Sequence, residues 1–246
     1  MHIGPNGMSF ARMFCLSLAL ALGGCAGLPR DPSMPISDPY EATNRSVLSA
    51  NQAVLHPVAT VVRSGTPGVA RARLLDFNQN LQEPRVFAND ILQGRPKSAL
   101  NTLGRFITNS TIGLGGLVDV ASRGGLPPES GDFGQTLFVW GFAAGDYVVL
   151  PFFGPSTTRD TAGLIVDMVG DPVGLAVGAR FGFAGSAALA GIDAAARVSQ
   201  LKEAEDASID FYSFIRSSYY QTRRAELREA IGQSSAIESP AVIGGR

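Results

Sequence analysis

Histidine, the side chain used most often as a general base at neutral pH and a frequent metal ligand, occurs only at positions 2 and 56. His2 lies in a stretch that we expect to be removed, so His56 alone could support His-dependent chemistry. It precedes a proline and has apolar neighbours, which favours a packing or helix-end role. No G-x-S-x-G, G-x-G-x-x-G, Walker A or H-E-x-x-H pattern is present. The sequence therefore does not favour an enzyme, and we expect no cofactor and no metal.

The cysteines predict a covalent modification instead. An uncharged apolar run, residues 13–22, follows Arg12 and leads into Gly23-Gly24-Cys25. A basic flank, a short apolar core and small residues at its end are typical of a secretory signal peptide. The Leu-small-small-Cys ending resembles the bacterial lipobox, in which the cysteine is acylated; the alternative is a plain signal peptide with a chance cysteine. We expect residues 1–24 to be a lipoprotein signal peptide and Cys25 to be the lipid anchor.

The fate of Cys25 also bears on location. The other cysteine, Cys15, lies in the discarded segment, so the mature chain has one thiol and forms no internal disulfide. In bacterial lipoproteins, a residue other than Asp after the lipidated cysteine usually implies transfer to the outer membrane, and here that residue is Ala26. We therefore expect an outer-membrane lipoprotein, anchored in the inner leaflet and facing the periplasm.

Composition narrows the class of protein further. Charged residues make up 17% of the 246 positions, against roughly 25% in an ordinary domain, and the mean hydropathy is +0.14. The net charge of −1 argues against a nucleic-acid binder, which would be basic. No uncharged run after residue 24 has the length and purity of a membrane-spanning helix, which needs about 20 apolar residues. Short helices with one apolar face could still lie in one leaflet.

The elements that must position any site are predicted to be helices, so the fold class is all-α. A tether rich in proline should occupy residues 25–39, one helical domain residues 40–232, and a disordered tail residues 233–246. We predict a helix over 40–62 that Pro57 kinks or divides, and helices that begin at Pro67, Pro84 and Pro96. Residues 121–132 read as a loop, residues 147–150 as an ambiguous strand, and Ser156 as the N-cap of a helix through Met168.

A long amphipathic helix is predicted over residues 197–231. Apolar residues recur at helical spacing along the predicted helices. They are Val47, Leu48, Val54, Leu55, Val58, Val61 and Val62; Val69, Leu74, Phe77 and Leu81; Val86, Phe87 and Ile91; Leu100, Leu103, Phe106 and Ile107; and Val198, Leu201, Tyr212, Ile215 and Tyr219. The set that begins at Val86 and the set that begins at Val198 are expected to face inward.

A series of longer motifs carries a family resemblance across residues 38–223. In order they are Asp38-Pro39-Tyr40-Glu41 with Asn44-Arg45; Phe77-Asn78-Gln79-Asn80-Leu81-Gln82-Glu83-Pro84; Asn89-Asp90-Ile91-Leu92-Gln93-Gly94; Arg105-Phe106 with Asn109-Ser110-Thr111-Ile112-Gly113; Gly116-Leu117-Val118-Asp119-Val120-Ala121; Phe133-Gly134-Gln135-Thr136-Leu137; Leu150-Pro151 with Gly154-Pro155-Ser156; Arg159-Asp160; and Asp210, Tyr212, Arg216, Tyr219 and Gln221. This series resembles the MlaA/VacJ family of outer-membrane lipoproteins. It departs from the family in the first motif, where Tyr40, Ala42 and Thr43 replace the usual residues, and at Gly145-Asp146-Tyr147.

The resemblance implies a ring-like assembly of short amphipathic helices embedded in one membrane leaflet, with a central amphipathic channel. Through it, phospholipids from the outer leaflet would pass to a soluble periplasmic lipid-carrier protein for retrograde transport, which maintains lipid asymmetry. The family typically associates with a trimeric outer-membrane porin, and its activity involves no covalent chemistry.

A lipid path of this kind needs a polar lining for headgroups, because polar residues in a membrane-embedded wall are costly unless they face water or a ligand. Hydrogen bonding between helices would explain each candidate about as well. The candidates are Asn109, Ser110, Thr111, Gln135, Thr136, Arg159, Asp160 and Asp167. Two other classes of function remain open: a periplasmic lipid-handling hydrolase, and a structural, porin-associated lipoprotein without a lipid path.

Overall fold

The computed structural model describes residues 31–171, 174, 176 and 205–232, and it separates residues 1–31 from a unit that begins at Pro32. Every described helix and strand belongs to this second unit. Cys25, the predicted signal peptide, Val198, Leu201 and the predicted tail lie outside the described residues, and the predicted domain boundaries stay predictions.

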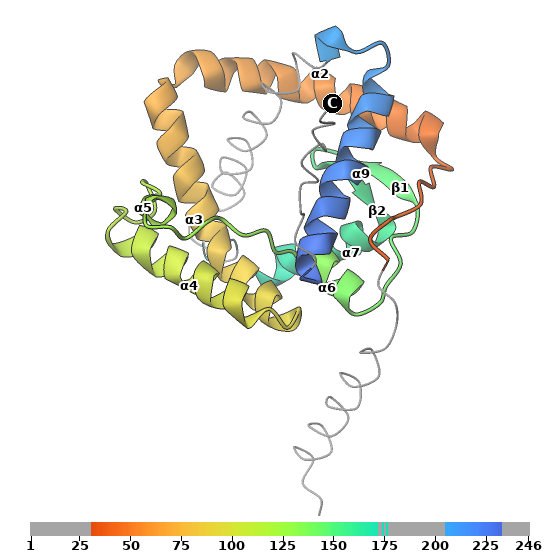
Figure 1. Cartoon of the computed structure of the whole chain (residues 1–246). Coiled ribbons are helices and arrows are strands. Elements are labelled where there is room, and N and C mark those ends of the chain that lie inside the picture. The colour runs from red at the N-terminus through yellow and green to blue at the C-terminus, as the bar shows by residue number, and fades with distance from the viewer. Residues whose placement is uncertain (1–30, 172–173, 175, 177–204, 233–246) are drawn as a thin grey trace, which may run out of the picture. The chain divides into compact units, whose positions relative to one another are not determined.

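The unit is mostly helical, as predicted, with one small β-hairpin. Its elements are α2 (Glu41–Gly65), α3 (Gly68–Leu92), α4 (Pro96–Thr111), α5 (Val120–Arg123), α6 (Phe133–Val139), β1 (Tyr147–Leu150), β2 (Gly154–Thr157), α7 (Thr158–Gly170) and α9 (Phe211–Ala230). Helices α2, α3 and α4 follow one another along three sides of an open frame, and α9 runs along the fourth side (Figure 1). The hairpin, α6 and α7 lie on the α9 side of this frame.

Side chains next to the helix ends fix where most helices begin. Asp132, Thr157 and Asp210 each accept a hydrogen bond from a backbone N–H in the first turn of α6, α7 and α9, respectively, as N-caps do. Pro96 occupies the first turn of α4, where the missing N–H of proline costs nothing. After α3, Gly94 adopts a φ of +72°, the left-handed conformation that commonly ends helices.

One proline differs from the prediction. The helix predicted to begin at Pro84 does not exist as a separate element, because α3 runs without interruption from Gly68 to Leu92. Pro57 lies inside α2 and does not divide it, and the alternative that it kinks this helix stays a prediction. The buried side chains of Glu83 and Val86 flank Pro84, which indicates that packing of α3 outweighs the lost backbone hydrogen bond.

Smaller differences concern residues 121–171 and the C-terminal helix. The first residues of the predicted loop are helical, in α5. The N-cap of α7 is Thr157 and not Ser156, because the Thr157 side chain accepts the hydrogen bond from Asp160 N. The ambiguous segment 147–150 is a strand, whose partner β2 places Tyr147 opposite Thr157 in antiparallel register. Within the predicted helix over 197–231, residues 205–207 are helical, residues 208–210 are not, and α9 begins at Phe211.

Hydrophobic packing is concentrated where α6, the hairpin and α9 meet. A cluster of nine buried residues there combines aromatic and aliphatic side chains: Met34, Phe138, Val139, Tyr147, Val149, Tyr212, Tyr220, Leu227 and Ala230. The rings of Tyr147 and Tyr220 lie 5.8 Å apart, within the usual range for aromatic pairs. This cluster confirms Tyr212 as an inward position of the C-terminal helix.

Elsewhere the polarity of the helices is the reverse of that in a protein with a hydrophobic core. Val58 and Val61 of α2 are exposed, whereas Asn44 and Asn51 of the same helix are buried. The amide of Asn44 accepts a hydrogen bond from Val149 N (2.8 Å) and donates one to Tyr147 O (3.1 Å), so it fastens α2 to β1.

Helices α3 and α4 show the same pattern. Val69, Leu100, Leu103 and Ile107 are exposed, while α3 buries Asn78, Asn80, Glu83, Asn89 and Asp90. The inward prediction is confirmed for Val86, which is buried, and is wrong for Ile91, which is exposed.

Candidate functional site

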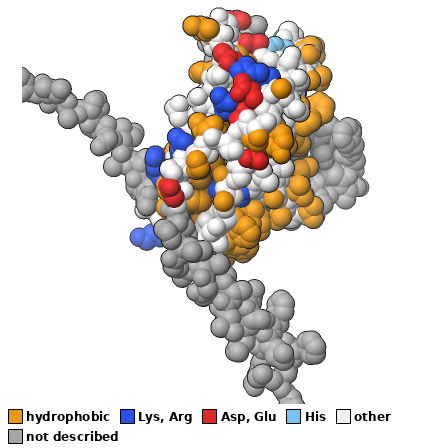
Figure 2. Space-filling model, turned by 90° about the vertical axis from the view of Figure 1, so that its right-hand side faces the viewer, with side chains coloured by type: hydrophobic (Ala, Val, Ile, Leu, Met, Phe, Trp, Pro, Cys, Tyr) orange, Lys and Arg blue, Asp and Glu red, His pale blue; other side chains and the backbone are white. Residues whose placement is uncertain are grey.

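The exposed surface of the described helices is unusually apolar. Large hydrophobic side chains are exposed at positions three or four residues apart, as on α4, where Leu100 is 70% exposed and Ile107 53% exposed. The exposed set continues on α2, α3 and α7 and in the turn after α4: Val54, Val58 and Val61; Val69, Ile91 and Leu92; Ile165, Val166, Met168 and Val169; and Ile112, Leu114 and Leu117. In Figure 2, hydrophobic side chains cover much of the right and lower parts of the face shown, and many of the charged ones gather above them.

Such a surface is typical of contact with membrane or with another protein, since monomers in water rarely expose large apolar patches. Among the residues that the structure describes, no helix is both long enough and apolar enough to cross a bilayer.

Behind this surface, a buried charge cluster joins α3 to α4 and α5. Arg105 is 1% exposed, and its Nε donates to Oε1 of Glu83 at 2.8 Å. Its Nη1 donates to the hydroxyl of Ser122 (2.9 Å) and to Leu126 O (2.7 Å). Burial raises the pKa of Glu83 although the Arg105 hydrogen bond and charge oppose the shift. The pair therefore occupies a position where hydrophobic residues would normally fill a core.

A second cluster joins α6, α7 and α9 around Asp160. Arg223 of α9 donates to both carboxylate oxygens of Asp160 and to both of Asp132, at 2.6–3.0 Å. Tyr219 donates to Asp160 at 2.5 Å. Burial would raise the pKa of Asp160, but the charge and hydrogen bonds of Arg223, with help from Arg159 and Tyr219, lower it to about 2.

Close contact between α6 and α7 depends on glycine. A Cβ atom added to Gly163 would lie 2.3 Å from the backbone nitrogen of Gly134, so no other residue fits there without displacing a helix. At this crossing, Asp167 of α7 accepts hydrogen bonds from the amide of Asn89 (3.0 Å) and from Phe133 N (2.9 Å). Burial raises the pKa of Asp167, although those two hydrogen bonds oppose the shift.

The structure separates the eight predicted lining residues into two groups. Three lie at the end of α4, and five lie on α6 and α7: Asn109, Ser110 and Thr111; and Gln135, Thr136, Arg159, Asp160 and Asp167. Most of their polar atoms bond within the protein. Asn109, for example, donates to Asp119 and accepts from Val120 N and Ala121 N. Oε1 of Gln135 is buried and has no hydrogen-bond partner in the part of the chain described. Their role in lining a lipid path stays a prediction.

His56, the candidate base, lies on α2 with its Nε2 3.4 Å from Oε2 of Glu205. The amide of Gln52 donates to the same carboxylate at 2.7 Å. These contacts tie α2 to residues that precede α9, as the packing interpretation expects. Within the described ranges, no group of three or more His, Cys, Asp and Glu side chains gathers in a way that could hold a metal ion.

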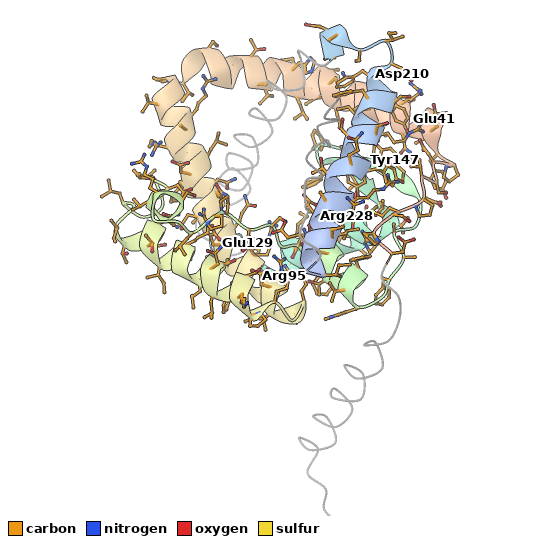
Figure 3. The ribbon with its side chains drawn as sticks, in the orientation of Figure 1. Glu41, Arg95, Glu129, Tyr147, Asp210 and Arg228 are labelled. Atoms are coloured by element: carbon orange, nitrogen blue, oxygen red, sulfur yellow. The ribbon has the colours of Figure 1, made fainter. Side chains whose placement is uncertain are left out.

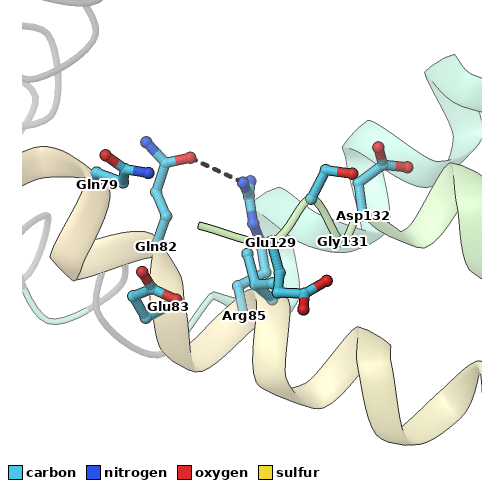
Figure 4. A pocket seen from close by; sticks show the side chains of 9 residues that line it. Gln79, Gln82, Glu83, Arg85, Glu129, Gly131 and Asp132 are labelled. Atoms are coloured by element: carbon cyan, nitrogen blue, oxygen red, sulfur yellow. Dashed lines mark hydrogen bonds between the residues drawn. The ribbon is translucent and has the colours of Figure 1, made fainter. Parts of the chain in front are cut away.

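A polar cavity of about 230 Å³ lies between the middle of α3 and the segment before α6. Its lining comes from these two elements: Gln79, Gln82, Glu83, Arg85 and Val86; and Glu129, Ser130, Gly131 and Asp132. Figure 4 shows Gln82 and Arg85 pointing toward one another, with the 129–132 segment beside them, and a hydrogen bond of 3.0 Å from Nη2 of Arg85 to Oε1 of Gln82.

The carboxylates of this cavity are already paired. Glu83 binds Arg105, Asp132 binds Arg223, and Glu129 binds Arg95 at 2.8 Å. Figure 3 shows Glu129 beside Arg95, which precedes α4. Arg85, Gln82 and Glu129 were not predicted as site residues. Gln79 to Pro84 belonged to a motif, but nothing in the sequence indicated that residues 129–132 lie against it.

Comparisons with known proteins agree with this architecture. The model of the MlaA lipoprotein family matches residues 36–226. The intermembrane phospholipid transport system lipoprotein MlaA of Escherichia coli (strain K12) is 40% identical over 162 residues, which cover 61% of this chain and 64% of that protein. The lipoprotein of the same name from Haemophilus influenzae is 31% identical over 235 residues, covering 86% and 88%. In its match to the Escherichia coli relative, the chain thus spans 64% of that relative's length.

A solved structure gives a similar result. That structure is described as the structural basis for maintenance of bacterial outer membrane lipid asymmetry. One of its chains superposes on this chain with a TM-score of 0.65 and is 32% identical in sequence. The match covers 78% of this chain and 99% of that chain.

Proposed function

This chain belongs to the MlaA lipoprotein family, and from that membership we propose that it removes mislocalised phospholipids from the outer leaflet of the outer membrane. It would be anchored through Cys25 in the inner leaflet and would pass lipids to a soluble periplasmic carrier for retrograde transport. Two relatives named as phospholipid transport lipoproteins, and a similar structure described in terms of lipid asymmetry, support this proposal. We further propose a trimeric porin as its partner in the membrane.

The observation that carries the proposal is the reversed polarity of α2, α3 and α4. Hydrophobic side chains such as Val61 and Leu100 are exposed, and charged pairs such as Glu83–Arg105 are buried between helices. In a leaflet, the outward faces would lie against acyl chains, where exposure of apolar groups carries no penalty. Lipid gives no hydrophobic driving force between helices, so hydrogen bonds, ion pairs and close packing must hold them together.

This arrangement suits lipid transfer better than hydrolysis. Moving a phospholipid requires an apolar surface for its tails and polar groups for its headgroup, but no reacting side chain. The described residues provide an extended apolar surface on α2, α3, α4 and α7 and a polar cavity against α3. We propose that the lipid remains chemically unchanged.

The proposal can be tested by deleting the gene and measuring phospholipid in the outer leaflet with a headgroup-reactive probe or an outer-leaflet phospholipase. Phospholipid should accumulate in the deletion strain and return to the wild-type level when the gene is restored. A Cys25→Ala variant, which lacks the acylated residue, should fail to restore it. If the deletion strain shows no accumulation, the transport role is wrong and the structural alternative is favoured.

A further inference from the structure

Helix α3 is joined to its neighbours through carboxylates that outnumber the arginines beside them. Near its C-terminal end, the guanidinium of Arg95 meets three carboxylates from three parts of the chain. Its nitrogens lie 3.3 Å from Oδ1 of Asp90 on α3, 2.8 Å from Oε2 of Glu129 and 3.6 Å from Oε1 of Glu229 on α9. One guanidinium balances the charge of one carboxylate, so this group has an excess of negative charge when all three acids are ionised.

The same imbalance continues along α3. Arg105 of α4 contacts two carboxylates, that of Glu83 on α3 at 2.8 Å and that of Asp119 at 3.5 Å. Asp167 of α7 is buried and has no cation within 4.0 Å in the described ranges, although the charge of Arg85 acts on it from farther away. Acidic groups are therefore in excess where α3 packs against α4 and α7.

Asp90 is the most confined of these acids. It is 0% exposed, and the hydroxyl of Thr102 on α4 donates to its Oδ2 at 2.8 Å. Its Oδ1 faces the 129–132 segment, since a Cβ added to Gly131 would lie 3.5 Å from it. Within the described ranges this oxygen accepts no hydrogen bond. A buried, ionised carboxylate without a full set of donors is costly, so its environment favours the protonated form.

The charges that act on Asp90 come from the elements packed against it. Burial raises the pKa of Asp90 to about 6. The hydrogen bond from Thr102 and the charge of Arg95 oppose this shift. The negative charges of Glu129 and Glu229 add to it. Asp90 therefore changes its charge within the range of pH that surrounds this value.

Glu229 responds in the same direction. Burial raises its pKa, and the charge of Arg95 opposes this shift. The negative charges of Glu129 and Glu226 reinforce it. Because Glu129 and Glu229 both lie against Nη2 of Arg95, they are close to one another and repel when both are ionised. A proton on either one removes this repulsion.

The carboxylates that tie α9 to α2 and α7 differ, because arginines surround them. Asp160 contacts Arg223 and Arg159, each at 2.9 Å, and although burial opposes the shift its pKa is lowered to about 2. Asp210 accepts two hydrogen bonds from Arg45, at 2.9 and 2.8 Å, and these lower its pKa. Both acids stay ionised at every pH above about 4, so their contacts do not change in that range.

We propose that the contact of α3 with α4, the 129–132 segment and the end of α9, built around Asp90 and Arg95, is a proton-dependent joint. It is tightest in mildly acidic medium, where Asp90 or one of its acidic neighbours holds a proton, and it loosens as the pH rises. A folded state that binds more protons than the unfolded one loses stability with rising pH, which fixes the direction of the effect. Because α3 forms one side of the frame in Figure 1, loosening lets this side move while α9 stays fixed. This mobility does not depend on the proposed transport of phospholipid.

Hydrogen–deuterium exchange of the full chain in detergent micelles, followed by mass spectrometry between about pH 5 and pH 8, tests this joint. The measured quantity is the protection factor of each segment, corrected for the intrinsic dependence of amide exchange on pH. For a carboxyl with a pKa of 3.8 in the unfolded state and about 6 in the folded state, protection of α3 should fall about tenfold across this range. Protection of α9 should change by less than about twofold, because its acids do not titrate there.

Two variants separate the joint from a general effect of pH. Asp90→Asn removes the charge with little change in shape, so it should abolish the fall in protection of α3. Asp76→Asn is the matched control and should leave the fall unchanged, because Asp76 is a partly exposed carboxylate of the same helix that pairs with Arg73 at 3.0 Å. Glu229→Gln changes an exposed position outside the core and should reduce the fall.

Three results would overturn the inference. The first is a protection factor of α3 that stays constant across the range of pH. The second is a fall of equal size in α3 and α9, which would show a general loss of stability. The third is a fall in α3 that persists undiminished in Asp90→Asn or, where that variant does not fold, in Glu229→Gln.

Discussion

Replacing Arg105 tests whether buried ion pairs, in place of a hydrophobic core, hold α3 against α4. The Arg105→Gln variant removes the charge and shortens the side chain at a position that is 1% exposed. It breaks the 2.8 Å contact with Glu83 and the hydrogen bonds to Ser122 and Leu126 O. Glu83, which is 3% exposed, then stays buried without its cation.

The expected cost can be worked out from this geometry. Removing one partner of a buried pair typically destabilises a protein by about 3–5 kcal/mol, because the other charge remains uncompensated. For a chain of this size that corresponds to a fall in Tm of roughly 6–20 °C. The unpaired Glu83 should also take up a proton on folding. Burial already raises its pKa, so the variant should lose stability as the pH rises.

The free energy of unfolding can be measured by chemical denaturation in micelles at several pH values. The exposed Arg123→Gln variant serves as the control and should change stability by less than about 0.5 kcal/mol. Replacing both Glu83 and Arg105 by Leu and Met should recover part of the loss, since apolar residues of similar volume often substitute for a buried pair. A loss below about 1 kcal/mol in Arg105→Gln would refute the structural role of this pair.

Three further predictions concern other parts of the unit. Asp160→Asn should destabilise the protein at neutral pH. Because the folded-state pKa of Asp160 is lowered to about 2, the difference in stability from wild type should persist above pH 4 and shrink as the pH falls toward 2. A difference that does not change with pH would contradict this prediction. Gly163→Ala should lower the free energy of unfolding by about 1–3 kcal/mol, measured by thermal denaturation, because its Cβ would overlap Gly134. Gly170→Ala in the same helix is the control and should cost little, because its Cβ would meet open space. Equal effects of the two variants would disprove the close crossing. Leu100→Asp should weaken binding to phospholipid vesicles in a flotation assay while Leu100→Met leaves it intact, and unchanged flotation of the Asp variant would show that α4 does not face lipid.

Local sequence signals predicted the positions of the helices better than their orientation. Proline at position 96 and the apolar spacing correctly indicated helices over most of residues 41–111. Pro84 misled the prediction because packing between α3 and α4 keeps the helix continuous. Periodicity cannot tell which medium a face meets, so it placed Ile91 inward although this residue is exposed.

The cavity between α3 and residues 129–132 could not be predicted from the sequence, for a different reason. Its two walls are separated by more than forty residues, and their contact depends on the close approach of Gly131 to Val86, where an added Cβ would lie 3.0 Å from Cγ1. The eight candidate lining residues were chosen as polar positions in apolar surroundings. Several of them form hydrogen bonds between elements, as Asn109 does.

The most direct test of phospholipid transport by this protein traces the lipid itself. Phospholipid labelled in the outer leaflet can be traced to the inner membrane by separating the two membranes at intervals after the label is added. We predict that this flux falls in a deletion strain and recovers when the wild-type chain is restored. An equal flux with and without the protein would contradict the proposed transport of phospholipid.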